Sequence, residues 1–258
     1  MADYGSMFHK PSSDGPEPRA TAAVLNIGNE LLAGEIRNTN GRWLGGELDE
    51  IGLRLVTIGV VPDDVERIAD FVSWARDRHD VVLLTGGLGP TPDDVTRDAV
   101  ALAFGVVCEV DHGLEQELLA AGGHMARFAS AWSRRPAGSR ILEHPAGGAP
   151  AFTIANVYAL AGDPVEMQAT FTLLSEELGR WPRMCVWRRT YAVTEDRVSS
   201  ILRDVANAWS DVHVCSYPRL APEGPVVEIV LRATMAAAVE IAGAEVEATL
   251  ARTGVRPA

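Results

Sequence analysis

The sequence predicts a three-layer α/β/α domain with a mainly parallel sheet, followed by a small α+β domain. Three observations lead to this prediction. Strand and helix signals alternate after about residue 20, the apolar run 80–85 shows no polar alternation, and a fresh strand and helix pattern starts near residue 183. Alternating units form parallel sheets with helices on both faces, and a continuous apolar run is typical of a strand buried on both faces.

The first three strand and helix units are regular. The apolar run "AAVLNIG" ends in a glycine, and the helix after it ends at Gly52. The second segment that we expect to be helical carries Val65, Ile68, Ala69, Val72 and Ala75 on one face. The predicted elements are a strand at 22–28, a helix at 38–52, a strand at 53–62, a helix at 63–78 and a strand at 80–85.

The remaining segments are less regular. Residues 112–133 look helical but contain Gly122 and Gly123, and residues 140–162 read as short strands joined by a Pro/Gly turn. Residues 1–20 are rich in Pro, Ser, Gly and Asp, so we expect a disordered tail, then domains at 21–182 and 183–258. The later predicted elements are a helix at 163–179, a strand at 185–193, a helix at 195–209, strands at 212–216 and 226–233, and a helix at 235–252.

Composition and charge exclude several classes of protein. The chain has 47% hydrophobic and 22% charged residues, as ordinary globular proteins do. A net charge of −12 argues against partners such as nucleic acids or anionic membranes. With no signal-peptide pattern and no apolar stretch long enough to span a bilayer, we expect a cytoplasmic protein. The only lysine is Lys10, which disfavours lysine-based phosphate binding and Schiff-base chemistry. The three cysteines are widely spaced and indicate neither disulfides nor a zinc site.

The segment "TGGLGPTPDDVT" (85–96) is the best candidate for chemistry. Glycines after a parallel strand let backbone amides converge on a ligand, and the following helix adds its positive end, so phosphate needs no lysine there. Asp93 and Asp94 would repel a bare polyphosphate. Mg²⁺ or another divalent cation between them reverses that repulsion, because it binds carboxylate and phosphate oxygens together.

Helix capping explains the same acids without a ligand. Thr91 as N-cap, Pro92 at the first helical position and Asp94 at the third resemble a capping box. The spacing alone favours capping for Asp94 and leaves the two roles even for Asp93. In "VVPDDVE", the spacing supports a capping box of Asp63 with Glu66 at least as well as a ligand role at the sheet rim.

The first strand supplies a third rim segment, "IGNELLAGEIRNTN". Glu30 follows the strand directly and is a candidate for the ligand crevice. Asn38, Thr39 and Asn40 precede a helix, where caps and solvated loop residues are the default interpretation. A dinucleotide-binding glycine fingerprint, a zinc-type histidine spacing and a GxSxG elbow are all missing from the sequence.

In order and spacing, these three segments resemble the MoaB/Mog-type molybdopterin-binding family and, within it, the CinA (competence/damage-inducible protein A) branch. The likeness continues through "HPAGGAPAF" and "AGDPVEMQATF" and covers about residues 20–180. The part around "CSYPRL" is similar to the small second domain of the branch. The amidase domain of full-length CinA proteins does not follow, so nicotinamide-mononucleotide deamidation is not implied.

The resemblance implies a MoaB/Mog-like fold that binds a nucleotide or pterin phosphate, with molybdopterin as a candidate ligand. In the wider family it implies magnesium-dependent adenylyl transfer, and in the CinA branch metal-dependent hydrolysis of a nucleotide diphosphate of the ADP-ribose or FAD type. It also implies a homo-oligomer, a dimer or trimer. We expect hydrolysis, with a molybdopterin adenylyltransferase-like role, a non-catalytic binding protein and an oligomeric scaffold as alternatives.

Carried onto this chain, the resemblance assigns residues to roles. Asp63, Asp93 and Asp94 would hold metal or steer the attacking water, and Gly86, Gly87 and Gly89 would cradle phosphate. The other expected ligand-binding residues are Thr85, Thr91, Glu30, Asn40, Pro164 and Glu166. The chain departs from the branch pattern at Asn38, where an acid is usual, at Ala151, where a glycine is usual, and at 161–164, where "AGDP" replaces PGxP.

Overall fold

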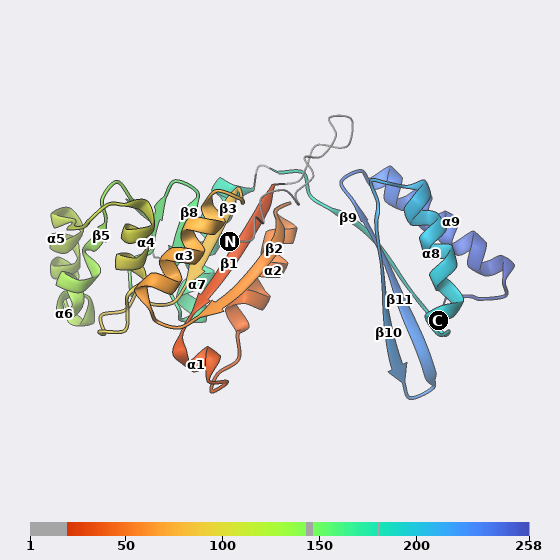
Figure 1. Ribbon diagram of the computed structural model, residues 1–258, viewed down its shortest axis with the longest axis horizontal. Helices are drawn as coiled ribbons and strands as arrows, with labels where there is room; N and C mark the ends of the chain where they lie inside the picture. Colours follow the sequence, from red (N-terminus) through yellow and green to blue (C-terminus); the bar gives the residue numbers. More distant parts are fainter. Residues whose placement is uncertain (1–19, 143–146, 180, 258) are drawn as a thin grey trace, which may run out of the picture. The chain divides into compact units, whose positions relative to one another are not determined.

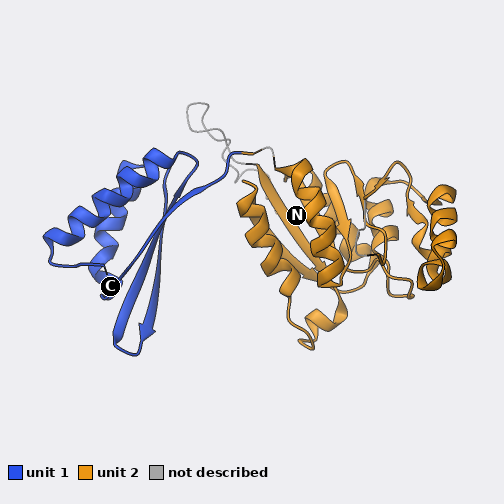
Figure 2. Ribbon diagram, turned by 180° about the vertical axis from the view of Figure 1, so that it is seen from behind, with its two compact units in different colours: residues 1–18, 182–258 blue, residues 19–181 orange. Residues whose placement is uncertain are grey.

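The computed structural model describes residues 20–142, 147–179 and 181–257. Nearly all of the tail predicted at 1–20, and the His144 end of "HPAGGAPAF", therefore lie outside the described residues. The chain forms two compact units, and the division between them in the sequence lies between Trp181 and Pro182 (Figure 2).

The larger unit is built on a six-stranded sheet in the order β2-β1-β3-β8-β7-β6. The first four strands run parallel, and β7 and β6 are antiparallel to their neighbours, so the predicted mainly parallel sheet is confirmed. β3 is buried along its whole length, as its apolar sequence predicts. The bounds are β1 (Thr21–Ile27), β2 (Arg54–Val61), β3 (Val81–Thr85), β6 (Arg140–Ile141), β7 (Phe152–Ile154) and β8 (Val157–Leu160).

Helices cover both faces of this sheet (Figure 1). On one face, α2 (Thr39–Glu50) and α7 (Pro164–Leu178) bury Leu44, Leu48 and Phe171. On the other face, α3 (Val65–Arg76) and α4 (Thr96–Phe104) bury Ile68, Val72 and Val100. The three-layer architecture is confirmed. Side chains of β1, β3 and β8 contribute to both of these cores.

Two helices begin later than their capping signals predict. α4 begins at Thr96, and Val95 before it makes no side-chain cap, so the predicted capping box of Thr91 and Asp94 is wrong. α3 is capped by Asp64, whose carboxylate accepts from the backbone N–H of Arg67 at 2.9 Å. The cap predicted at Asp63 is therefore one residue too early, and the Asp63 carboxylate is available for another contact.

A helical hairpin follows α4. The predicted helical stretch 112–133 is two helices, α5 (His112–Ala121) and α6 (Gly123–Trp132), because Gly122 between them has φ +72°. A two-stranded ribbon, β4 (Cys108–Val110) with β5 (Arg134–Pro136), closes the base of the hairpin.

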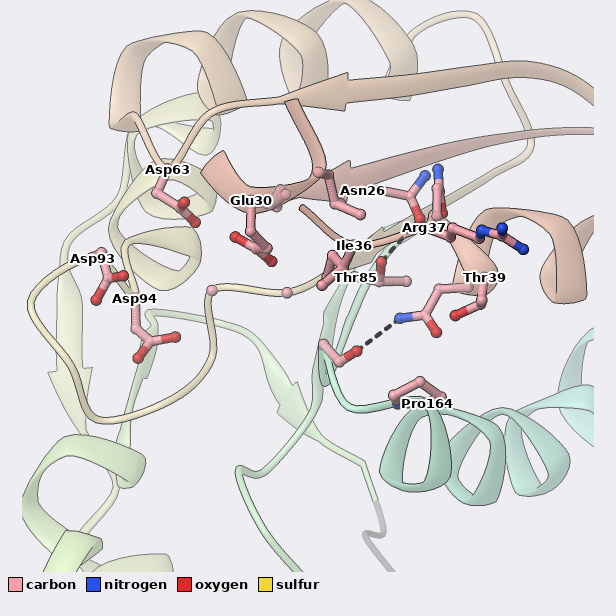
Figure 3. Close-up of a pocket in the computed structure, with 17 residues that line it drawn as sticks. Asn26, Glu30, Ile36, Arg37, Thr39, Asp63, Thr85, Asp93, Asp94 and Pro164 are labelled. Atoms are coloured by element: carbon pink, nitrogen blue, oxygen red, sulfur yellow. Dashed lines mark hydrogen bonds between the residues drawn. The ribbon is translucent and has the colours of Figure 1, made fainter. Parts of the chain in front are cut away.

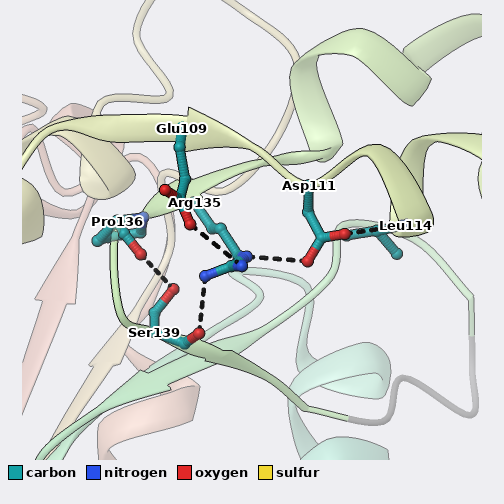
Figure 4. Close-up of polar contacts among 6 residues, drawn as sticks. All are labelled: Glu109, Asp111, Leu114, Arg135, Pro136 and Ser139. Atoms are coloured by element: carbon teal, nitrogen blue, oxygen red, sulfur yellow. Dashed lines mark hydrogen bonds and ion pairs between the residues drawn. The ribbon is translucent and has the colours of Figure 1, made fainter.

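Arg135 fastens this hairpin to the ribbon (Figure 4). Its Nε donates to Asp111 at 2.9 Å, its Nη2 lies 3.1 Å from Glu109 Oε1, and its Nη1 donates to the carbonyl oxygen of Ser139 at 2.8 Å. Asp111 in turn caps α5 by accepting the N–H of Leu114. These contacts lower the pKa of Asp111, the backbone bond most of all, so the cap stays ionised.

The smaller unit packs two helices on a three-stranded antiparallel sheet in the order β10-β11-β9. The predicted strands 212–216 and 226–233 are parts of one longer hairpin whose turn lies at residues 222–223. The bounds are β9 (Cys185–Tyr191), α8 (Asp196–Ala208), β10 (His213–Ala221), β11 (Gly224–Ala233) and α9 (Ala236–Arg252). Within the described parts of both units, no helix is long and apolar enough to span a lipid bilayer.

Candidate functional site

A cavity of about 240 Å³ lies where the parallel strands of the larger unit end. We call it the rim cavity. Its walls come from the ends of β1 and β3, from the turn after β2, and from the first residues of α2 and α7. In open α/β sheets the carboxyl ends of parallel strands are the usual place for a ligand. The lining residues are Asn26, Ile27, Glu30, Leu31, Ile36, Arg37, Asn38, Thr39, Asn40, Asp63, Thr85, Gly86, Gly87, Asp93, Asp94, Gly162 and Pro164.

Two buried polar side chains contribute to the rim cavity. Thr85 Oγ1 donates to Asn26 Oδ1 at 3.2 Å, and Asn26 Nδ2 donates to the carbonyl oxygen of Gly59 on β2. Asn26 and Thr85 are 1% and 2% exposed, so this bridge ties the ends of three strands together. Sequence reasoning missed Asn26. Its signal was a lone polar residue in the apolar run 22–28.

The glycine loop packs closely on the sheet. Gly86 has φ +103°, and a Cβ there would collide with the carbonyl oxygen of Ile27. Its amide donates to Leu160 O at 3.2 Å, while its own carbonyl accepts from Thr96 Oγ1 at 2.8 Å. Gly87 has φ +67°, and its amide has no acceptor among the described residues. The amide available to a ligand in this turn is therefore that of Gly87 rather than that of Gly86.

Asp94 fastens the second half of the loop. Its Oδ1 accepts the amide of Gly89 at 2.7 Å, and its Oδ2 accepts both the amide and the hydroxyl of Thr91. Arg97, which is 4% exposed, donates to Leu88 O at 2.8 Å and lies in the electrostatic range of Asp94. Burial lowers the pKa of Arg97 to about 10. With the Gly89 amide and the Asp94 oxygens engaged, the loop is held in shape by its own side chains.

Four carboxylates, of Glu30, Asp63, Asp93 and Asp94, lie on one side of the rim cavity (Figure 3). Asp63 accepts the amide of Asn29 at 2.8 Å, at the start of the short helix α1 (Asn29–Leu32), which also carries Glu30. Burial raises the pKa of Asp63, and the charges of Glu30 and Asp93 raise it further. Asp93 is exposed, and its Oδ1 lies 2.6 Å from the Thr91 hydroxyl, whose single proton it shares with Asp94; this contact lowers the pKa of Asp93. One acid is thus biased toward holding a proton and its neighbour toward remaining ionised.

The opposite side of the cavity is cationic and rich in donors. Figure 3 shows Arg37 and Thr39 across the cavity from the acids. Asn38 caps α2 by accepting the amide of Gly41 at 2.9 Å, which confirms the capping interpretation for that residue. Asn40 Nδ2 donates to Gly162 O at 2.8 Å and so joins α2 to the loop before α7. The positive end of the α2 dipole and the Arg37 guanidinium make this side suitable for phosphate. Sequence reasoning did not single out Arg37.

The acids fit a magnesium ion that is shared with a substrate. In the described part of the chain no three His, Cys, Asp or Glu side chains form a ready metal cluster. Mg²⁺ does not require one, because it commonly binds one or two carboxylates, several waters and the phosphate oxygens of a substrate. Asp63 and Asp93 could supply those carboxylates, since each uses one oxygen in a hydrogen bond and has a second oxygen.

Most of the residues predicted from the sequence meet in this cavity. The rim cavity contains Asp63, Asp93, Asp94, Glu30, Thr85, Gly86, Gly87, Asn40 and Pro164. Gly89, Thr91 and Glu166 line neighbouring cavities instead. The structure therefore separates the expected ligand-binding set into a group at the strand ends and a group beyond the glycine loop.

The fold and the cavity define an α/β protein with its candidate site at the carboxyl ends of a mainly parallel sheet. Residues 23–180 match the family described as "Probable molybdopterin binding domain", and the chain belongs to this family. Residues 190–258 match the family described as "FAD synthase, middle domain". The expected family is thereby confirmed.

The relatives agree with the CinA resemblance. A CinA-like protein from Frankia casuarinae is 36% identical over 254 residues, which cover 91% of this chain and 58% of that protein. A protein from Archaeoglobus fulgidus is 35% identical over 76% of this chain and 85% of its own length. The crystal structure of CinA from Thermoplasma acidophilum, a protein of unknown function by its title, matches 61% of this chain and 98% of its own length, with 29% identity and a TM-score of 0.57. The chain thus spans little more than half of the Frankia relative.

Proposed function

We propose that the larger unit is a metal-dependent pyrophosphatase that cleaves the phosphoanhydride of a nucleotide diphosphate of the ADP-ribose or FAD type. One observation carries the proposal: the rim cavity sets carboxylates on one side against a guanidinium and a helix N-terminus on the other. A phosphoanhydride needs both, because its phosphates require positive partners while the attacking water requires a base.

The donors of the cavity would bind the phosphates. The free amide of Gly87, the N-terminus of α2 and the Arg37 side chain can neutralise part of the phosphate charge. Asp93, which stays ionised, would hold a divalent cation against the same phosphates, and Asp63 beside it would be left to accept a proton. A bound divalent cation offsets phosphate charge and lowers the pKa of its water.

The two acids are suited to different tasks. Asp63, whose pKa is raised, is the better proton acceptor near neutral pH, and Asp93 is the more permanent negative charge. In hydrolysis, Asp63 would take a proton from water as the water oxygen bonds to one phosphorus. The bridging P–O bond then breaks, and the second phosphate leaves with the bonding electrons.

Hydrolysis of ADP-ribose and FAD by the whole chain tests the proposal. With Mg²⁺ or Co²⁺, chromatography should show AMP and the second phosphate product, and EDTA should abolish both. Asp93→Asn should remove activity, whereas Asp70→Asn, on the exposed side of α3, should leave it unchanged. Tight, EDTA-insensitive ligand binding without any product would instead support a non-catalytic binding protein.

Adenylyl transfer is a second candidate function. It is favoured by the match of residues 23–180 to a molybdopterin-binding family and by the FAD synthase match of the smaller unit. The same cavity would then bind ATP and an acceptor phosphate. Incubation with Mg²⁺, ATP and molybdopterin distinguishes the two functions, since transfer yields adenylated pterin and pyrophosphate while ADP-ribose remains intact.

A further inference from the structure

We propose that a second cavity, beyond the glycine loop, binds the planar heterocycle of the substrate whose phosphates occupy the rim cavity. This inference rests on the proposed function for the phosphate half of the ligand. The second cavity, which we call the α6 cavity, measures about 430 Å³, within the roughly 300–1,000 Å³ of small-molecule sites. It is lined chiefly by α6, by the loop around Gly148 and by residues 161–163.

The two cavities are neighbours across the glycine loop. Both are lined by Gly87, Asp94 and Gly162. Gly87 is also the residue whose amide remains available for phosphate. A ligand with its phosphate on Gly87 can therefore place one arm in the rim cavity and the other in the α6 cavity. A nucleotide diphosphate has two such arms, of which at least one ends in a planar ring.

α6 presents three rings to the α6 cavity. His124, Phe128 and Trp132 recur every four residues and so share one face of the helix. The ring centroids of Phe128 and Trp132 are 5.3 Å apart, and those of His124 and Trp132 are 6.1 Å apart. His124 is exposed, Phe128 half-buried and Trp132 buried, so the stripe runs from solvent into the protein. Rings stack on such surfaces without regard to the identity of the base.

Packing alone does not account for this stripe. Phe128 and Trp132 also belong to the small hydrophobic cluster of the hairpin, where any large apolar side chain would serve. The indole N–H of Trp132, however, meets no acceptor among the residues that the structure describes, although the side chain is only 5% exposed. Buried donors normally have partners, because leaving one unpaired is costly. A ring nitrogen or carbonyl oxygen of a ligand would supply the missing acceptor.

The rest of the cavity wall is built largely of small residues. Gly148, Ala149, Ala161 and Gly162 have little or no side chain. Gly148 has φ +84°, and a Cβ there would collide with the carboxylate of Glu166. The carboxylate of Glu166, which lines the same cavity, therefore packs against the backbone of Gly148. A nitrogen heterocycle carries both donors and acceptors, whereas a sugar phosphate has no flat face for the aromatic stripe.

The stripe is held in position by the hairpin rather than by the ligand. Arg135 joins β5 to Asp111 at the start of α5, as Figure 4 shows, and α5 packs along α6. Ring positions that are fixed before binding reduce the entropy lost on binding. The α6 cavity is therefore a preformed subsite for adenine, flavin or pterin rings, which share this chemistry.

Calorimetric titration of the whole chain with AMP, FMN and ribose 5-phosphate, in Mg²⁺, tests the inference. AMP and FMN should bind more tightly than ribose 5-phosphate. Phe128→Ala should weaken AMP binding about 5- to 100-fold, and Trp132→Phe, which keeps a ring but removes the N–H, about fivefold. Neither change should alter ribose 5-phosphate binding. Leu119→Ala, on the exposed side of α5, is the matched control.

Several outcomes would overturn the inference: equal affinity for AMP and ribose 5-phosphate, no binding of AMP by the unaltered chain, or AMP affinity unchanged by Trp132→Phe. If Phe128→Ala fails to fold, Phe128→Leu and Trp132→Phe retain the apolar volume and carry the test. The readout is binding without turnover. AMP binding that depends on the rings, without any hydrolysis, would therefore refute the proposed function and support the ring subsite. Hydrolysis with AMP binding that does not depend on the rings would support the proposed function and refute the ring subsite.

Discussion

Replacing Asp63 with asparagine removes a charge and keeps a hydrogen bond. The Asn29 amide donates to Asp63 Oδ2 at 2.8 Å, and an asparagine oxygen can accept the same bond. A bond to a charged acceptor is about twice as strong as a neutral one, so the change costs about 1 kcal/mol. The charges of Glu30 and Asp93 repel the Asp63 carboxylate and raise its pKa. Asparagine removes this repulsion, which offsets part of the cost. We expect Tm without metal to stay within about 4 °C of the parent value.

Activity should respond very differently. Loss of a general base commonly lowers the rate about 100- to 10,000-fold, so ADP-ribose hydrolysis by Asp63→Asn should fall by that factor. The pKa of Asp63 in the folded chain lies above 3.8, so its protonated form, which cannot act as a base, persists to higher pH. The kcat/KM of the parent protein should therefore rise with pH through that folded pKa. Differential scanning calorimetry and a hydrolysis assay across pH measure both effects. A variant with unchanged kcat, or one whose Tm falls by 10 °C or more, would refute this reasoning.

Three further predictions concern groups around the site. His79 is half-buried, and burial of its ring nitrogens lowers its pKa from 6.5. The unfolded chain therefore binds the proton first as pH falls, and ΔG of unfolding should decrease below pH 6.5. His79→Phe should flatten that slope in urea titrations. Thr96→Val removes the donor to Gly86 O and should lower ΔG of unfolding by about 1–3 kcal/mol, while Thr96→Ser restores most of it. Arg135→Met should lower ΔG of unfolding by about 1.5–3 kcal/mol, because it removes the charged hydrogen bond to Asp111. It should also loosen the start of α5, which would appear as faster amide hydrogen exchange at Leu114. Unchanged exchange at Leu114 would contradict the anchoring role of Arg135.

Hydrophobic periodicity made much of the fold predictable. The apolar run 80–85 and the helical face around Ile68 depend on local burial, which a single sequence records directly. Start signals of helices were less reliable. Asp94 has the spacing of a capping residue, but its carboxylate turns back to the amides of Gly89 and Thr91, and α4 starts later. The long β10–β11 hairpin was underestimated because Pro218 interrupts its strand signal, although β10 is an edge strand, where proline is tolerated.

The candidate site was predictable wherever a residue follows a strand. Asp63, Glu30 and Gly87 all do so, and parallel strands bring such residues to one rim. Contacts over long sequence separations could not be inferred in this way. The bond from Asn40 to Gly162 spans 122 residues, and only the folded chain shows that it closes the rim cavity beside Arg37.

The most direct test of the account is a crystal structure of the chain with Mg²⁺ and a methylene analogue of ADP-ribose that resists hydrolysis. We predict one phosphate within hydrogen-bonding distance of the Gly87 amide and a cation bound to Asp93 and to that phosphate. Phosphates bound elsewhere, or in the rim cavity with no cation on Asp93, would contradict the metal-dependent mechanism.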